Sequence, residues 1–372
     1  MKIAILTYPL HSNFGFLMQA YAMQSFLRKL GHDPYTINIV PPKTPLKNKI
    51  KQTIKDIIFS IKGVPGCRAF RYWPTSEQQA YMDKNTWDFL NANLKLTNRL
   101  KSFKELYNFN VEDYDAFIVG SDQVWRYAYL DQITSFYFDF VPDHIKRMSY
   151  AASFGIANLD YPRCQKDSCK NLIGKFNVVT VRETEGVQIC KDEFGVEATK
   201  VLDPVFLLNK NDYAELAEKG KNHSNKKFLF YYLLDPTAEK IAYIESIASE
   251  NNYDIVNIKP SSFHLLGPKH IKDLIYPSVC DFLSGFYNAD YVVTDSFHGT
   301  AFSILLNKQF TVFPNVNRGN SRLTSILFTF GLQDRIYTEN HDYKKIIEYN
   351  KVNSIISEEI IKSESIIKKF LQ

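Results

Sequence analysis

The sequence predicts an α/β fold built from two doubly wound domains, with a ligand cleft between them. The chain has 372 residues, more than one ordinary domain needs. Short apolar runs typical of buried strands alternate with helical segments, which predicts parallel sheets covered by helices. The alternation forms two successive series, separated by a polar stretch at residues 218–227. In paired domains of this kind, ligands bind in the crevice beyond the carboxyl ends of the strands.

The first series assigns residues 1–217 to an N-terminal Rossmann-like domain. It begins with a strand at 3–7, a helix at 16–30 that stops at Gly31, and a strand at 35–40. Strand, helix and strand in this order form a βαβ unit, which favours a parallel sheet. Further strands of this domain are predicted at 116–119, 147–151, 178–181 and 200–202.

A basic helical insertion interrupts this domain at about 43–112. Between residues 43 and 71 the sequence has eight lysines and arginines and a single acid, Asp56. Isoleucines recur at helical spacing in this stretch, at Ile50, Ile54, Ile57, Ile58 and Ile61. Such a helix can lie on an anionic membrane surface or face an acidic ligand. The simpler interpretation, which we favour, is a helix packed on its domain with a solvated basic face.

The second series assigns residues 226–342 to a C-terminal Rossmann-like domain. Its strands are predicted at 228–234, 255–258, 291–294 and 310–312. Apolar residues continue at helical spacing through the tail, which predicts a long helix within 343–372. We expect this helix to pack, and it can cross back to the first domain.

Composition excludes several classes of protein. The net charge of +5 is well short of what a dedicated nucleic-acid binder carries. The five cysteines lack the spacing of a disulfide framework or a zinc site, so we expect reduced thiols, no metal and a cytoplasmic location. No segment reaches the roughly 18 apolar residues of a transmembrane helix. The apolar N-terminus ends at Pro9 and is typical of a strand, not of a signal peptide.

The loop after the first predicted strand is the first candidate site. It has the sequence HSNFG at residues 11–15 and precedes a helix. Gly15 lets backbone N–H groups approach an anion, and the helix start adds a positive partial charge. Asn13 and Gly15 are therefore candidate anion-binding residues, although the loop is not a dinucleotide fingerprint.

Asp122 is the second candidate, in a GSDQVW turn directly after the strand at 116–119. A carboxylate at this position can act as an acid or base, or accept a hydrogen bond from a sugar hydroxyl. Equally, it can cap the N-terminus of the segment that follows.

The third candidate is the TDSFHGT loop at residues 294–300. His298 can donate to a phosphate or carboxylate, or transfer a proton near neutral pH. Ser296 and Gly299 can add hydroxyl and backbone donors. The alternative is a histidine that caps a helix. The spacing forms no Ser-His-Asp triad, because the serine and histidine are local neighbours.

Arginines complete the candidate site. Arg182 ends the strand at 178–181, while Arg318 and Arg322 lie in a polar loop after the last strand. A guanidinium binds carboxylate or phosphate through two hydrogen bonds. Several arginines at strand ends indicate a ligand with more than one anionic group.

At these residues the sequence resembles the polysaccharide pyruvyl transferase family. The GSDQVW and SFHGTAF blocks together are specific, and the blocks follow the family's order. The matching segments are residues 11–27 (containing SNFGFLMQAYAMQSFL), 117–125 (FIVGSDQVW), 149–155 (SYAASFG), 181–183 (VRE), 201–208 (VLDPVFLL), 289–302 (ADYVVTDSFHGTAF) and 320–323 (NSRL).

The resemblance implies a fold similar to the two-domain GT-B glycosyltransferases. It also implies transfer of a pyruvyl group from phosphoenolpyruvate onto two sugar hydroxyls, which forms a ketal and releases phosphate. Phosphoenolpyruvate is then a substrate, and no cofactor is expected. The acceptor is a glycan of a cell-surface polysaccharide or its lipid-linked precursor. The acceptor residues cannot be assigned, and the basic helix at 47–62 is expected near the acceptor or at the inner membrane face.

Site roles follow from the resemblance residue by residue. It associates Arg182 and His298 with donor binding, and Arg322 matches the family's closing arginine motif. We expect His298 to be the general acid or to stabilise the cationic carbon of the donor. Asp122 is the candidate base for a sugar hydroxyl, with Asp295 in reserve.

Two other functions remain open at this point. A GT-B glycosyltransferase that uses a nucleotide sugar shares the two domains, but the sequence shows no clear nucleotide site. A non-catalytic glycan-binding protein shares the fold, but it has no need for convergent anion-binding residues.

Overall fold

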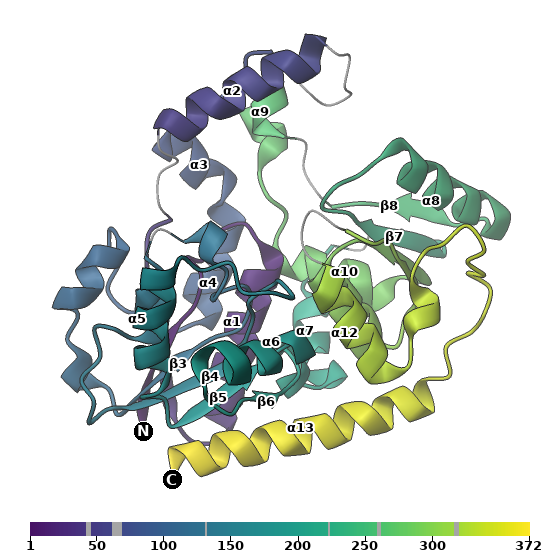
Figure 1. Cartoon of the computed structure of the whole chain (residues 1–372). Helices are drawn as coiled ribbons and strands as arrows, with labels where there is room; N and C mark the ends of the chain where they lie inside the picture. The colour runs from purple at the N-terminus through teal and green to yellow at the C-terminus, as the bar shows by residue number, and fades with distance from the viewer. Residues whose placement is uncertain (42–45, 62–68, 131, 222–223, 259–261, 316–319) are drawn as a thin grey trace.

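The chain folds around two parallel sheets, which confirms the predicted α/β class with two doubly wound domains (Figure 1). A computed structural model describes the whole chain except residues 42–45, 62–68, 131, 222–223, 259–261 and 316–319. The first sheet has six strands in the order β2-β1-β3-β4-β5-β6, and the second has four in the order β10-β9-β7-β8. Every strand pairing in both sheets is parallel, so all strand ends of a sheet point to one edge.

The first sheet is built from short apolar strands. They are β1 (Lys2–Leu6), β2 (Asp33–Thr36), β3 (Ala116–Val119), β4 (Lys146–Ala152), β5 (Val178–Val181) and β6 (Thr199–Lys200). Helices α1 (Phe14–Lys29), α5 (Arg163–Ile173) and α6 (Thr184–Ile189) connect them. Helix α1 begins two residues before the predicted start because the Asn13 side chain caps it. Strand β2 contains Pro34, which an edge strand tolerates.

The second sheet follows helix α7 (Lys210–Glu218). Its strands are β7 (Phe228–Tyr232), β8 (Asp254–Val256), β9 (Tyr291–Thr294) and β10 (Gln309–Val312). Its helices are α8 (Ala238–Asn251), α9 (Phe263–Leu266), α10 (Val279–Asn288), α11 (Phe297–Leu305) and α12 (Asn320–Phe330). The two sheets share one topology. In each, the second strand along the chain forms the edge next to the first strand, and the later strands are added on the opposite side of the first strand.

One apolar core runs without a break between the domains. Phe14 at the start of α1 stacks on Phe282 of α10, with ring centroids 4.7 Å apart. Residues of α7 and α11 belong to the same core cluster. The domains are therefore packed closely, and the cleft between them is confined to the strand ends.

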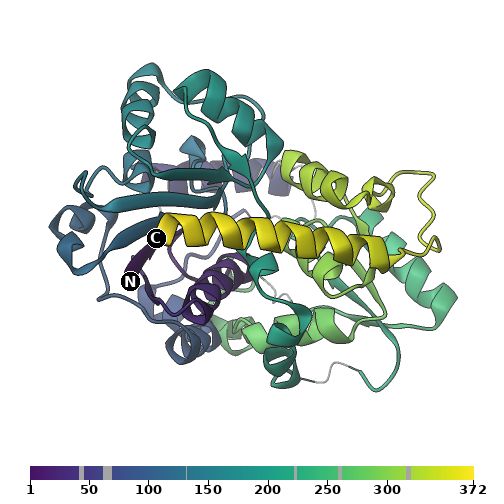
Figure 2. The same cartoon turned by 90° about the horizontal axis from the view of Figure 1, so that it is seen from below.

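Helix α13 (Tyr349–Leu371) spans both domains, as Figure 2 shows from below. Its first half places Val352 and Ile356 in the interdomain core. Its last turns place Ile367 and Phe370 against Ile3 and other residues of the first sheet. The chain thus ends on the domain in which it begins.

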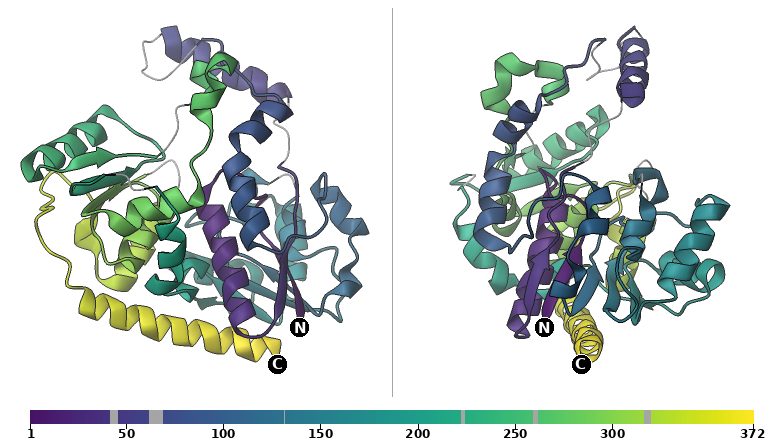
Figure 3. Two further views of the ribbon diagram at one scale, coloured as in Figure 1. Left: turned by 180° about the vertical axis from the view of Figure 1, so that it is seen from behind. Right: turned by 90° about the vertical axis from the view of Figure 1, so that its left-hand side faces the viewer.

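The insertion of the first domain contains helices α2 (Leu46–Ile61), α3 (Ser76–Met82) and α4 (Lys84–Asn93). Met82 packs with Phe263 and Leu274, which lie between β8 and α10 of the second domain, so the insertion contacts that domain. Figure 3 shows α2 at the far end of this assembly. The expectation that the isoleucines of α2 pack against the domain is wrong, because Ile50, Ile54 and other apolar residues of this helix are exposed.

Candidate functional site

Both sheets direct their loops to one crevice. In the first sheet, β2 lies on one side of β1 and β3 lies on the other side. In the second sheet, β8 and β9 lie on opposite sides of β7 in the same way. A crevice opens at such a switch point, beyond the carboxyl ends of the strands. The loops after β1, β3, β5 and β6 meet those after β9 and β10 there, and they carry the residues described below.

Arg182 follows β5 and is almost fully buried, with 2% of its side chain exposed. Its Nη1 donates to Asp203 Oδ2 at 2.8 Å, and its Nη2 lies 3.7 Å from Asp122 Oδ1. Its guanidinium lies 4.1 Å from the ring centroid of Phe297, which belongs to the second domain. Nε and Nη2 have no hydrogen-bond partner among the described residues. Arg182 therefore keeps donors for a ligand at the domain boundary.

Asp203 is the main residue that the sequence analysis missed. It follows β6, and its Oδ1 accepts a hydrogen bond from the backbone N–H of Val205 at 3.1 Å. Its Oδ2 accepts from Ser121 Oγ at 2.8 Å and lies 3.7 Å from Nε2 of His298. Arg182 and His298 thus meet at one carboxylate oxygen. The Asp-Pro pair after a strand was the available signal, because aspartate before proline is typical of a helix start.

His298 lies in the first turn of α11, and its ring faces the start of α1 in the other domain. A Cβ on Gly15 would lie 2.2 Å from Nδ1 of His298, so only glycine permits this approach. The helix is capped by Ser296, so the interpretation of His298 as a cap is wrong. Burial lowers the pKa of His298. The nearby negative charge of Asp203 acts in the opposite direction, and the positive charge of Arg182 lowers the pKa further. The imidazole is therefore neutral near pH 7.

Asp122 lies after β3 in a left-handed backbone conformation, with φ of 78°. Its Oδ1 accepts from the backbone N–H of Gln123 at 2.7 Å and lies 3.7 Å from Nη1 of Arg322. Burial alone would raise the pKa of Asp122, but Arg182, His298 and Arg322 bring it below its usual value. Asp122 is therefore ionised. No helix follows it directly, so the capping interpretation is wrong.

A cavity of about 170 Å³ lies between the domains at these residues. Seven residues predicted for the site line it: Asn13, Gly15, Asp122, Asp295, Ser296, His298 and Arg322. Arg182 instead lines a smaller hollow, which shares Arg322 and Phe297 with the cavity. Gly299 does not line the cavity, and its N–H donates to Ser296 Oγ at 3.4 Å.

The side chains of Asn13 and Ser296 occupy the helix starts at the cavity. Asn13 Oδ1 accepts from the backbone N–H groups of Gly15 at 3.0 Å and Phe16 at 3.4 Å. Ser296 Oγ does the same for α11. Backbone donors at both helix starts are therefore partly used within the chain, and an anion would depend mainly on the arginine and histidine side chains.

Asp295, the reserve base, is held by the fold. Its carboxylate accepts from Lys240 Nζ at 2.7 Å, from the Leu234 N–H at 2.6 Å and from the Asp235 N–H at 3.1 Å. These contacts join the loop after β7 to the loop after β9. The arrangement supports a structural role for Asp295.

Glu183, next to Arg182, is a second residue that the sequence analysis did not assign. Its Oε1 accepts from Ser153 Oγ at 2.9 Å and from the N–H groups of Phe154 at 2.8 Å and Gly155 at 3.1 Å. Burial raises the pKa of Glu183 above its usual value. Glu183 therefore fixes the loop after β4 beside Arg182. Its position beside Arg182 in the VRE block was the available signal.

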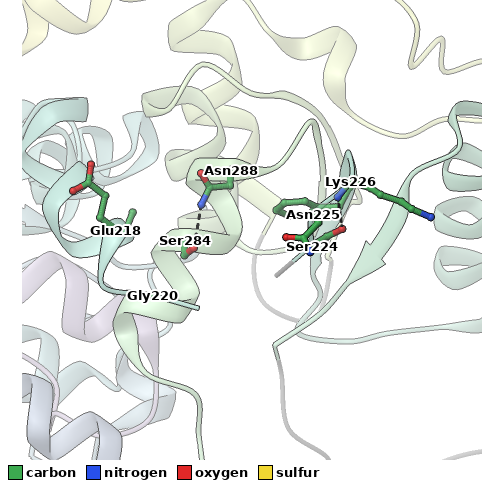
Figure 4. Close-up of a pocket in the computed structure, with 9 residues that line it drawn as sticks. Glu218, Gly220, Ser224, Asn225, Lys226, Ser284 and Asn288 are labelled. Carbon is green, nitrogen blue, oxygen red and sulfur yellow. Dashed lines mark hydrogen bonds between the residues drawn. The ribbon is translucent and has the colours of Figure 1, made fainter. Parts of the chain in front are cut away.

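A larger hollow of about 400 Å³ lies away from this crevice, beside α7 and α10 (Figure 4). Ser284 and Asn288 hydrogen-bond on its wall at 3.1 Å. It shares no residue with the buried charged cluster, which makes the cluster the better candidate for chemistry. Among the described residues, no group of three His, Cys, Asp or Glu side chains is placed to hold a metal ion. The four described cysteines are free, while Cys67 and Arg318 lie outside the described residues.

Several solved structures resemble the chain at low sequence identity. MnaA from S. aureus, in a structure with UDP, shares 12% identity at a TM-score of 0.47, over 98% of this chain and 89% of that one. A UDP-GlcNAc 2-epimerase from Neisseria meningitidis, bound to UDP-GlcNAc, shares 11% at a TM-score of 0.45, over 100% and 94%. An alpha-glucosyltransferase in complex with UDP shares 8% at a TM-score of 0.44, over 100% and 95%. No curated protein matches the sequence.

One protein family matches the sequence directly. The match runs over residues 13–317 and so includes Asp122, Arg182 and His298. Arg322 lies just beyond the matched region. Because the match covers most of the chain, the protein belongs to the polysaccharide pyruvyl transferase family.

Proposed function

We propose that the protein transfers a pyruvyl group from phosphoenolpyruvate to two hydroxyls of a sugar, in a cell-surface polysaccharide or its lipid-linked precursor. The observation that carries the proposal is the convergence of Arg182, Arg322 and His298 from both domains around two buried carboxylates at the domain boundary. Phosphoenolpyruvate carries a carboxylate and a phosphate, and guanidinium groups bind both. Unpaired buried donors on Arg182 favour an anionic ligand, because such donors cost roughly 1–3 kcal/mol each when unused.

The reaction needs one proton on the donor and two hydroxyl additions. His298, protonated when the donor's negative charge lies beside it, gives its proton to the methylene carbon. The central carbon becomes cationic, and a sugar hydroxyl adds to it while Asp122 takes the hydroxyl proton. The bond from that carbon to the phosphate oxygen then breaks, and the second hydroxyl adds in its place. The proton of the second hydroxyl reprotonates His298, and the proton held by Asp122 passes to the released phosphate. The products are the ketal and inorganic phosphate.

The ionisation states of the free protein fit this order of events. Asp122 is already a carboxylate, because its pKa is lowered by the surrounding cations despite burial. His298 is neutral before the donor binds, because burial lowers its pKa. A bound dianion or trianion raises the pKa of a neighbouring histidine, so donor binding itself supplies the acid. The scheme uses only side chains and the two substrates.

Phosphate release from phosphoenolpyruvate, measured with a panel of glycan acceptors, tests the proposal. His298→Ala should lower the rate by roughly 10²–10⁴ while the protein still folds, because it removes the general acid. His144→Ala is the matched control, since His144 is exposed and pairs only with Glu112 among the described residues. Unchanged ketal formation by His298→Ala would contradict the assignment.

Thermal shift separates this proposal from transfer of a sugar from a nucleotide donor. We expect phosphoenolpyruvate to raise the melting temperature and nucleotide sugars to leave it unchanged, since ligand binding to the native state stabilises it. Protection by a nucleotide sugar alone would favour a glycosyltransferase. Binding of a glycan without phosphate release from any acceptor would favour a non-catalytic protein.

A further inference from the structure

Helix α2 presents its apolar side to solvent. Its apolar row repeats every three or four residues and so lies on one side of the helix. The exposed fractions are 73% for Leu46, 54% for Ile50, 53% for Ile54, 46% for Ile58 and 81% for Ile61. A helix that stabilised its domain would bury this row, so the orientation is the reverse of the usual one.

Polar contacts hold α2 in this orientation. Asp56 is its one buried residue among those described, and its carboxylate accepts from Arg71 Nε at 2.5 Å and from Gln52 at 3.0 Å. Lys49, on the same side, lies over the ring of Trp73 at 5.2 Å. Trp73 in turn packs on His264 of α9, with ring centroids 5.4 Å apart. The polar side of α2 is therefore fastened to the insertion, and the apolar side is left for something outside the chain.

A row of lysines borders the apolar row. Lys47, Lys51 and Lys55 follow one another at four-residue spacing, are exposed, and form no ion pair with any described residue. An apolar row bordered by lysines matches a helix that lies in the interface of an anionic membrane. A second copy of the chain would bring the same lysines together, and like charges oppose that contact.

We propose that α2 docks the protein on an anionic lipid surface, with its isoleucines in the acyl boundary and its lysines at the headgroups. Helix α2 has 16 residues, fewer than a membrane-spanning helix needs, so in this proposal it lies along the lipid surface. No candidate membrane span was found among the described residues. Helix α2 follows the carboxyl end of β2, and Figure 1 shows it beyond that end of the first sheet. The crevice lies beyond the carboxyl ends of the same strands. Docking would therefore turn the crevice side of the molecule toward the lipid.

Flotation of the full chain with vesicles tests this proposal without any enzyme assay. We expect binding to vesicles of phosphatidylcholine mixed with phosphatidylglycerol, weaker binding at high salt, and little binding to phosphatidylcholine alone. The double variant Ile50→Glu with Ile54→Glu should weaken binding at least about tenfold. Lys47→Gln, Lys51→Gln and Lys55→Gln should each weaken it about fivefold.

Ile361→Glu is the matched control, because Ile361 is 67% exposed and belongs to α13. Figure 1 shows α13 and α2 at opposite ends of the molecule. The control variant should bind vesicles like the unmodified protein. All the changed side chains are exposed, so the urea midpoints should agree, and this is measured first. As a second readout, Ile54→Trp should show a blue-shifted emission with anionic vesicles, and Ile361→Trp should not.

Three results would overturn the proposal. One is an unmodified protein that does not float with anionic vesicles. Another is equal flotation of the protein with and without the two glutamates. The last is self-association in sedimentation that the same double variant abolishes, with no vesicle binding, which would assign the apolar row to contact between copies.

Discussion

Asp122 and Asp295 are both buried carboxylates beyond a strand end, but their surroundings differ. Asp295 accepts two backbone N–H groups and the Lys240 ammonium, all within 3.1 Å. Asp122 accepts the N–H of Gln123, while its nearest arginine nitrogens lie at 3.7 Å, beyond hydrogen-bond range. A carboxylate whose oxygens all have close hydrogen-bond partners, such as Asp295, holds the neighbouring loops in place. A carboxylate among loosely placed cations keeps those cations ionised and leaves their donors for a ligand.

The substitution Asp122→Asn tests the functional half of this contrast and has the largest expected effect. We expect kcat to fall by roughly 10²–10⁴, because the base for the sugar hydroxyl is lost. The dissociation constant for phosphoenolpyruvate should fall as well, since a negative charge leaves the site. Asparagine tolerates the left-handed backbone at this position. Steady-state kinetics and direct titration measure the two effects.

The same change at Asp192, which is exposed and accepts a hydrogen bond from the Gln188 side chain, is the control and should leave both constants unchanged. An Asp122→Asn protein with full kcat and tighter donor binding would show that Asp122 only balances charge.

The substitution Lys240→Met tests the structural half. It leaves the buried Asp295 carboxylate without its cation, which should lower the free energy of unfolding by about 3–5 kcal/mol. Urea unfolding measures this effect. Lys344→Met, at an exposed pair with Glu250, should leave the midpoint unchanged. If Lys240→Met is as stable as the unmodified protein but inactive, Asp295 belongs to the chemistry and the contrast fails.

The substitution Gly15→Ala tests whether the contact between the domains positions His298. The new methyl group would overlap the imidazole and displace it, and a shift of about 1 Å at a catalytic group can cost roughly 10² in rate. Gly174→Ala is the control, because its methyl group would meet its nearest neighbours at 3.6 Å. Phosphate release measures both. Full activity in Gly15→Ala would mean that the position of His298 is not critical.

The smallest expected effect is the pH dependence of donor binding. Burial lowers the pKa of His298 in the free protein, and a bound anion raises it, so binding takes up a proton between the two values. The dissociation constant should therefore rise about fivefold from roughly pH 6 to pH 8. The donor phosphate titrates in the same range, with a pKa of about 6. Titration calorimetry with His298→Gln isolates the histidine contribution to this pH dependence. If the variant shows the same pH dependence as the unmodified protein, the effect comes from titration of the donor phosphate.

Most of the fold could be predicted from the sequence because buried strands leave a local signature. The runs at β3, β5 and β9 are apolar and bounded by turns, and their predicted ranges match the structure. The orientation of α2 could not be predicted in this way. Periodicity shows that a helix has an apolar side, but not whether the fold or the solvent receives it.

The site could be predicted only in part, for a related reason. Arg182 and His298 stand at strand ends, where polar residues are conspicuous. Asp203 and Glu183 act through contacts with residues 20 or more positions away, such as Ser121 and Ser153, and no local pattern reveals such contacts.

Helix α13 has a consequence for how substrates reach the crevice. A rod packed along both lobes resists their separation, because moving them apart would expose the apolar contacts at one of its ends. The two domains also share one apolar core, which a large relative movement would break. We therefore expect substrates to enter with small movements of the two domains, without a wide opening between them.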